Sequence, residues 1–79
     1  MRLDKFLKVS RIIKRRTLAK EVCDGGRIKI NGNVAKASST VKQDDILEIG
    51  FGERLSRYQI LKVEENARAD AAKDLYKQL

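Results

Sequence analysis

Apolar residues recur with helical spacing at the start of the chain. Leu3, Phe6 and Leu7 lie three or four positions apart, with basic residues on the other faces, which is typical of an amphipathic helix of about two turns. Ser10 and Arg11 are expected at the end of this helix or at the start of the next turn. The pattern therefore predicts a short N-terminal helix that packs one side on a core.

A second helix is expected after a short basic segment. Leu18, Val22 and Cys23 fall on one apolar stripe. Thr17 is the expected N-cap, because its hydroxyl can accept a hydrogen bond from a free amide of the first turn. Gly25-Gly26 is the expected end, since glycine adopts the left-handed conformation that closes many helices. We expect Cys23 to be buried and unreactive, as free cysteines in apolar patterns usually are.

The spacing then changes to the alternation of a strand. Ile28 and Ile30 alternate with basic residues, and the Asn31-Gly32 that follows is a strong signal for a two-residue hairpin turn. A second turn is expected at 43–45. The expected strands are 27–30, 33–35, 46–49 and 58–63, with a loop or bulge at 50–54.

The tail is rich in alanine and is predicted to be helical. Asn66 is the expected N-cap, and apolar residues follow at helical spacing as far as Leu79. Two helices, a small antiparallel sheet and a C-terminal helix on one core indicate an α+β fold. We divide the chain into a domain at 1–64 and a C-terminal helical extension at 65–79.

Charge is distributed unevenly along the sequence. Residues 1–42 contain 12 Lys and Arg against three acids, a net charge of +9, whereas residues 43–79 contain six against eight, a net charge of −2. A concentrated positive surface on a small ordered domain favours binding to a polyanion such as a nucleic acid. The alternative is that the charged residues form a solvated face that only makes the protein soluble. Charges scattered along the chain would favour this alternative, whereas the concentration of bases in residues 1–42 does not.

The main candidate contacts are residues of the two helices and of the turn between them. Lys and Arg that neutralise phosphates release counterions, which gives an affinity that falls steeply with salt. At Arg16 and Thr17, the start of the second helix adds free amide groups and the favourable end of the helix dipole. The candidates in this region are Arg2, Lys5, Lys8, Arg11, Lys14, Arg15, Arg16, Thr17 and Lys20.

The first hairpin offers two further candidates. Lys29 is expected to point away from the side of Ile28 and Ile30, where it would extend the basic surface. Asn31 is open to two interpretations, a contact to RNA or simply the first residue of the hairpin turn, and the turn is a sufficient explanation by itself.

Structured RNA fits this composition better than single strands or duplex DNA. The chain has two Phe and two Tyr, and none is interleaved with the basic residues as a platform for stacking bases. Structured RNA is recognised by shape, phosphates and hydroxyls, which Lys and Arg can contact. A DNA-binding helix-turn-helix remains an alternative, although the second helix would offer mainly Lys20, Glu21 and Asp24 to base edges, a poor set for reading them.

The sequence gives little support to catalysis. It has no His, so Cys23 has no imidazole partner, and a zinc site of the usual kind is not expected. Asp44-Asp45 is expected in a turn between strands, where Asp is common. We expect no metal, no cofactor and no enzymatic activity. Apolar runs are too short for a membrane span or a signal peptide, so we expect a cytoplasmic protein that does not bind membranes.

Four segments in register resemble the S4 RNA-binding domain, which is named after the fourth protein of the small ribosomal subunit. The resemblance covers about residues 1–50. It implies an αL-type motif, with two helices against a small bent sheet and RNA on the helical side. The four segments are RLDKFL, SRIIKRRTLAKEV, GGRIKINGNVAKASSTV and DDILEI.

The resemblance also implies site residues one by one. Asp4 enters the set through the resemblance alone, between Arg2 and Lys5, in a match to the family's opening RLDK. The other matches are Lys14 and Arg16 at the basic ends of its K-S-R segment, Arg27 and Lys29 in its first strand, and Asn31-Gly32 in its turn.

Two positions depart from the family pattern. Arg15 stands where a small residue is usual, which adds charge to the RNA face. Gln43-Asp44 stands where Pro-Gly is usual. This makes a turn there less favourable, because Asp adopts a positive φ less readily than Gly.

The length of the chain and its Ala-rich tail are similar to the RqcP family of ribosome-associated quality-control factors, and also to the heat-shock protein fifteen family. This resemblance implies binding to large ribosomal subunits obstructed by peptidyl-tRNA, with contacts to ribosomal RNA and P-site tRNA while the nascent chain is tailed. It implies the tailing factor RqcH as a partner, and we expect a monomer off the ribosome. A constitutive ribosomal or ribosome-assembly protein is the alternative, and a DNA-binding regulator is a more distant one.

Overall fold

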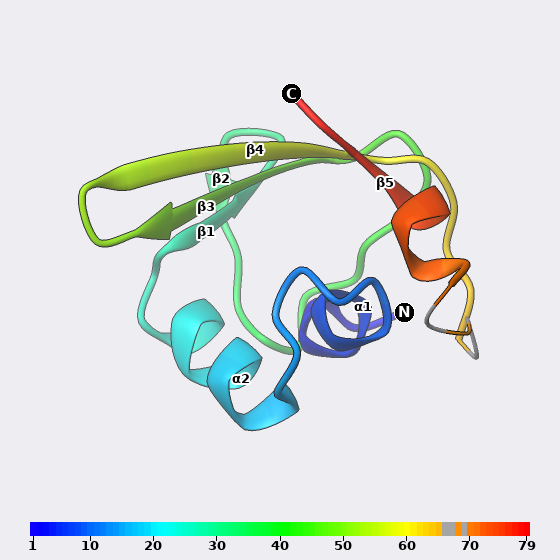
Figure 1. The fold of residues 1–79 in the computed structure, drawn as a ribbon. Helices are drawn as coiled ribbons and strands as arrows, with labels where there is room; N and C mark the ends of the chain where they lie inside the picture. The colour runs from blue at the N-terminus through cyan, green and yellow to red at the C-terminus, as the bar shows by residue number, and fades with distance from the viewer. Residues whose placement is uncertain (66–67, 69) are drawn as a thin grey trace.

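A computed structural model describes residues 1–65, 68 and 70–79 and arranges them in two layers. Over these residues, two α-helices lie on one face of a five-stranded antiparallel sheet with the strand order β2-β1-β3-β4-β5 (Figure 1). The expected α+β fold is confirmed. The helices are α1 (Leu3–Val9) and α2 (Arg16–Asp24), and the strands are β1 (Ile28–Ile30), β2 (Asn33–Val34), β3 (Ile46–Phe51), β4 (Arg54–Ile60) and β5 (Tyr76–Gln78), with a 3₁₀ turn, η1 (Ala72–Leu75), before β5.

The core lies between the helices and the sheet. Leu3, Phe6 and Leu7 of α1 are fully buried, as their spacing predicts. They belong to one apolar cluster with residues of the sheet. Burying a large apolar side chain stabilises a fold by about 1.5–3 kcal/mol, so a few positions are enough to hold α1 on the sheet. The fully buried sheet residues of the cluster are Ile28, Leu47, Ile49 and Ile60.

The second helix differs from its prediction at the start and along its stripe. Thr17 is not the N-cap: the helix begins at Arg16, and Arg15 occupies the cap position with an extended backbone. Leu18 is 49% exposed, and the buried stripe consists of Ala19, Val22 and Cys23. The hydrophobicity of Leu18 suggested an inward position, but the neighbouring Ala19 is the residue that is buried in the core cluster.

The hairpin turn at Asn31-Gly32 is confirmed. Asn31 has φ 51° and Gly32 has φ 86°, and two positive φ values are what a type I′ turn requires. The turn sets the register of β1 and β2, in which Lys29 faces Val34 and Ile30 faces Asn33.

The expected loop at 50–54 is wrong. β3 continues to Phe51 and β4 already begins at Arg54, so that only Gly52-Glu53 connects them. The last predicted strand, 58–63, is correspondingly misplaced, since β4 ends at Ile60. Gly50 suggested a break, but its amide N–H donates to the carbonyl oxygen of Arg27 at 2.9 Å and keeps the sheet continuous. Gly52, with φ 61°, makes the tight turn.

The expected C-terminal helix is also wrong. Ala72–Leu75 forms a single 3₁₀ turn, and β5 pairs antiparallel with β4, with Ile60 facing Tyr76. The ring of Tyr76 packs edge-on against Tyr58, with centroids 5.4 Å apart. An isolated helix of this length is only marginally stable, whereas pairing with β4 satisfies the backbone groups of that strand. The expected N-cap, Asn66, lies outside the described residues.

The turn before β3 forms despite its unusual sequence. Asp44 adopts φ 72°, a conformation that Gly takes more easily. The neighbouring Asp45 is buried, and its Oδ2 accepts the amide N–H of Lys42 at 2.9 Å. This side-chain hydrogen bond closes the turn in the way that Asp does in many loops.

The prediction that Cys23 is buried is confirmed, at 1% exposure. Burial raises the pKa of its thiol to about 11, and the nearby carboxylates of Asp4 and Asp24 add to the shift. A thiol with this pKa is protonated at neutral pH, so Cys23 is a packing residue and not a nucleophile.

We predict that Leu75→Ala destabilises the fold by about 2–4 kcal/mol, because Leu75 is fully buried at the end of η1, directly before β5. The matched control is Leu79→Ala, where the same atoms are removed from a side chain that is 59% exposed, with an expected change within about 0.5 kcal/mol. Urea unfolding monitored by circular dichroism gives both values. Equal, small changes would mean that the C-terminal residues do not pack on the sheet.

We also predict that the free energy of unfolding falls as the pH rises from about 9 to about 11. In this range the unfolded chain loses the Cys23 proton while the folded chain keeps it, so ionisation favours the unfolded state by up to about 2–3 kcal/mol. Urea unfolding at several pH values should show a smaller decrease in Cys23→Ala, whose other titrating groups are the same. Parallel curves for the two proteins would contradict the raised pKa.

Candidate nucleic-acid interface

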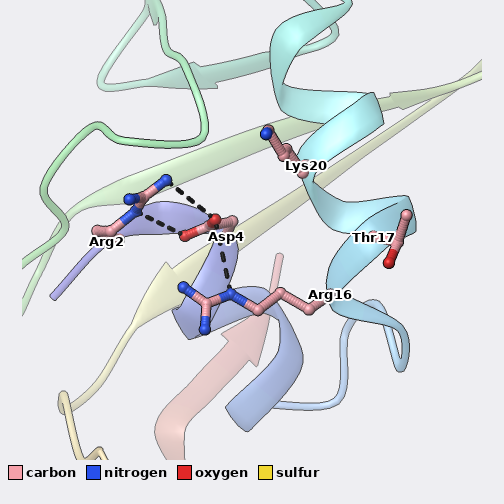
Figure 2. A pocket seen from close by; sticks show the side chains of 5 residues that line it. All are labelled: Arg2, Asp4, Arg16, Thr17 and Lys20. Atoms are coloured by element: carbon pink, nitrogen blue, oxygen red, sulfur yellow. Dashed lines mark hydrogen bonds and ion pairs between the residues drawn. The ribbon is translucent and has the colours of Figure 1, made fainter.

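The densest group of predicted site residues lies where α1 and α2 begin. An open depression of about 470 Å³, which we call the α1–α2 depression, is lined by five side chains from the two ends (Figure 2). All five were expected from the sequence, and together they carry three positive charges and one negative charge. They are Arg2, Asp4, Arg16, Thr17 and Lys20.

A buried carboxylate connects the two arginines of the depression. Asp4 is only 3% exposed. Its Oδ1 accepts Nε–H of Arg2 at 3.2 Å, and its Oδ2 accepts Nη2–H of Arg2 at 3.3 Å. The Nε of Arg16 lies 3.7 Å from Oδ2 on the other side, as Figure 2 shows. Asp4 therefore joins the start of α1 to the start of α2.

The backbone brings these residues together. Arg2 is the N-cap of α1 and has an extended backbone, which forms an isolated β-bridge with Thr40. Arg16 is the first residue of α2. Lys20 follows Arg16 by four positions and so lies on the same side of the helix. The core packing of α1 against α2 thus determines how the basic side chains are arranged around Asp4.

The start of α2 favours an anion. The N-cap, Arg15, makes no side-chain capping hydrogen bond within the described part of the chain. The first-turn amide groups of a helix and its dipole both attract negative charge, most strongly when no side chain caps them. Thr17 is exposed beside these amides, at the edge of the depression. A phosphate there would meet backbone donors as well as the arginines.

The remaining basic candidates of the helical layer do not line the depression. Lys5 is partly exposed, and its Nζ lies 3.9 Å from Oε2 of Glu65. The others are exposed, one on α1 and three in the segment between the helices, and they are Lys8, Arg11, Lys14 and Arg15. They add positive charge to the same layer of the molecule, where it strengthens attraction to a polyanion.

Three candidates are not brought to the depression. Arg27 lies after α2 and lines a separate hollow with Leu18. Lys29 points away from the core, as predicted, and therefore faces away from the helices, cross-strand from Glu48. Asn31 uses its side chain within the protein: its Nδ2–H donates to Oδ1 of Asp45 at 3.0 Å, and its Oδ1 accepts the amide N–H of Ile46 at 2.9 Å. The turn is thus an adequate explanation for Asn31.

Sequence reasoning placed Asp4 in the site but did not find its contacts. The signal that could have pointed to them is that Asp4 is the only acid among the first 20 residues, which contain eight Lys and Arg. An isolated acid in a buried position of an amphipathic helix requires positive partners nearby, because burying an unpaired charge is costly.

The described residues contain no group of three or more His, Cys, Asp or Glu side chains arranged to hold a metal ion. Within the same part of the chain, no helix is both long and apolar enough to span a membrane. The chemistry that the depression does offer is a set of hydrogen-bond donors with positive charge, which suits a phosphate group.

Comparison with known proteins agrees with this chemistry. The S4 domain family matches residues 1–47. A protein of Halalkalibacterium halodurans named "RQC P-site tRNA stabilizing factor" is 62% identical over 76 residues, which cover 96% of this chain and 86% of the relative. A protein of Bacillus subtilis with the same name is 58% identical over 96% of this chain and 88% of the relative.

The fold is similar to a solved structure as well. The trimeric structure of heat shock protein 15 from Vibrio cholerae superimposes with a TM-score of 0.89 and is 32% identical. The similarity covers 100% of this chain and 81% of that chain. The arrangement of two helices on an antiparallel sheet is therefore shared with a relative outside the P-site factors.

Proposed function

The chain belongs to the S4 domain family and to the family of the RQC P-site tRNA stabilizing factors, and we propose that it is an RNA-binding protein that acts on large ribosomal subunits during ribosome-associated quality control. It would bind subunits obstructed by peptidyl-tRNA and contact ribosomal RNA and P-site tRNA while the nascent chain is tailed. It would do so without catalysing a reaction.

The observation that carries this proposal is the α1–α2 depression. Arg2, Arg16 and Lys20 gather there beside the first turn of α2, on one side of the molecule. Bidentate arginine donors and helix amides are a combination that suits phosphate oxygens. Among the described residues, none that lines the depression is an aromatic on which single-stranded bases could stack. The arrangement therefore favours the backbone of a folded RNA.

Several finer features belong to the proposal. We assign the RNA-binding surface to residues 1–64, with 65–79 as an extension that completes the sheet. The tailing factor RqcH is the proposed protein partner, and the protein would be a monomer off the ribosome and act in the cytoplasm. Arg27 and Lys29 would contact RNA only where it extends beyond the helical layer.

Occupancy on ribosomal particles tests this function. The tagged protein is recovered from cells with stalled translation, and large subunits with and without peptidyl-tRNA are compared. The proposal expects substoichiometric binding, enriched on the subunits that carry peptidyl-tRNA. Equal and stoichiometric occupancy of all large subunits would indicate a constitutive ribosomal protein instead.

We predict that Arg16→Ala weakens association with large subunits roughly ten- to a hundredfold, because it removes charge-assisted hydrogen bonds to phosphate at the start of α2. The slope of log K against log salt should also become shallower by roughly one unit, as expected for one lost phosphate contact. Co-sedimentation at several salt concentrations measures both quantities.

The matched control is Arg57→Ala, which removes the same charge from the opposite face of the sheet, where Arg57 pairs with Glu48 at 3.0 Å. An exposed pair of this kind adds little stability, so the fold should persist. The control should retain nearly full binding. If both variants lost affinity equally, net charge and not the helical face would govern binding.

A further inference from the structure

We propose that Asp4 is a positioning residue for RNA: it holds the guanidinium groups of Arg2 and Arg16 in the geometry that binds a backbone phosphate in the α1–α2 depression. The inference rests on the proposed function, because it requires RNA to occupy the depression. Asp4 would then favour the binding of a phosphate, although its own negative charge repels one.

Asp4 is held more firmly than the arginines that it contacts. Its side chain is 4% exposed, whereas those of Arg2 and Arg16 are 52% and 50% exposed. Its Oδ1 also accepts the amide N–H of Lys5 at 2.8 Å, which ties the carboxylate to the backbone of α1. A fixed anion thus meets two long side chains that reach into solvent.

The contacts with Asp4 use the inner edges of the guanidinium groups. Arg2 donates from Nε to Oδ1 at 3.2 Å and from Nη2 to Oδ2 at 3.3 Å, and Nε of Arg16 lies 3.7 Å from Oδ2. A guanidinium group carries five N–H donors in a planar fork. Engagement at this edge leaves three N–H donors of Arg2, two on Nη1 and one on Nη2, and the Nη donors of Arg16 for the oxygens of a phosphate.

Two opposing effects of Asp4 can be compared. Its negative charge repels a phosphate, but the three bases of the depression keep the local charge at +2. Its contacts restrict two side chains before binding, so that less conformational entropy is lost when a phosphate arrives. If ordering outweighs repulsion, removing the charge of Asp4 weakens binding although the protein becomes more positive.

Asp4→Asn tests which effect dominates. Asn keeps a carbonyl oxygen for the Lys5 amide, but it replaces the other oxygen by an NH₂ group that cannot accept from an arginine. We expect roughly tenfold weaker binding to large subunits that carry peptidyl-tRNA, from the loss of side-chain ordering. Equal or tighter binding by a folded variant would overturn the proposal.

The matched control is Asp44→Asn, which removes one negative charge, as Asp4→Asn does, but at an exposed turn. Asn tolerates the positive φ of this position. It should bind equally or slightly more tightly. In an Arg16→Ala background, Asp4→Asn should have a smaller effect than in the wild type, since Asp4 acts partly through Arg16. Full additivity would contradict positioning.

The wild-type protein provides a measurement that does not depend on the variant's folding. In NMR spectra of the free protein, the Nε–H signals of Arg2 and Arg16 should be resolved and protected from solvent exchange, unlike that of the exposed Arg54. Averaged signals for all three would overturn the proposal.

The binding assay distinguishes failure of this proposal from failure of the proposed function. If the wild type itself does not bind large subunits, the proposed function fails. If the wild type binds and Asp4→Asn binds equally well, only the positioning role of Asp4 fails.

Discussion

The packing of α1 on the sheet is the constraint on which the rest of the structure depends. This helix has only seven residues, and Leu3, Phe6 and Leu7 bury their side chains in the apolar core that the described residues form. The same seven residues and their N-cap also supply Arg2 and Asp4 to the depression. Core and site are therefore adjacent in the sequence as well as in space. A domain of this size has little apolar surface to bury. A short helix such as α1 therefore supplies residues both to the core and to the site.

Charge then distinguishes the two sides of the molecule. On the helical side, Arg2 and Arg16 from the two helix starts both contact the buried carboxylate of Asp4. The positive side chains are therefore held in a defined arrangement there. On the open side of the sheet, Lys29, Glu48 and Arg57 lie across neighbouring strands with mixed signs. A polyanion is attracted by the first arrangement and only weakly by the second. The net charge of the chain hides this difference, because it sums over both sides.

Much of this could be predicted from the sequence, and the failures have physical causes. The helix of Leu3, Phe6 and Leu7 and the turn at Asn31-Gly32 follow from local rules, and both are confirmed. All five residues of the depression were candidates: the three bases through their charge, Thr17 through its place at the start of the second helix, and Asp4 through the family resemblance. The C-terminal strand was missed because Ala-rich propensity favours a helix, whereas the pairing of Ile60 with Tyr76 is a tertiary contact. The contact of Asp4 with Arg16 was missed for the same reason, since Arg16 is twelve positions away in the sequence.

The central claim is that RNA lies against the helical side and not against the open side of the sheet. A photo-crosslinking residue at Thr17 tests it most directly, compared with one at Lys77, whose strand partner is Gln59 on the opposite side. Large subunits that carry peptidyl-tRNA are irradiated with each protein, and the crosslinked RNA is sequenced. The account predicts crosslinks to ribosomal RNA or tRNA from Thr17 and few from Lys77. RNA crosslinks from Lys77 in the absence of any from Thr17 would contradict it.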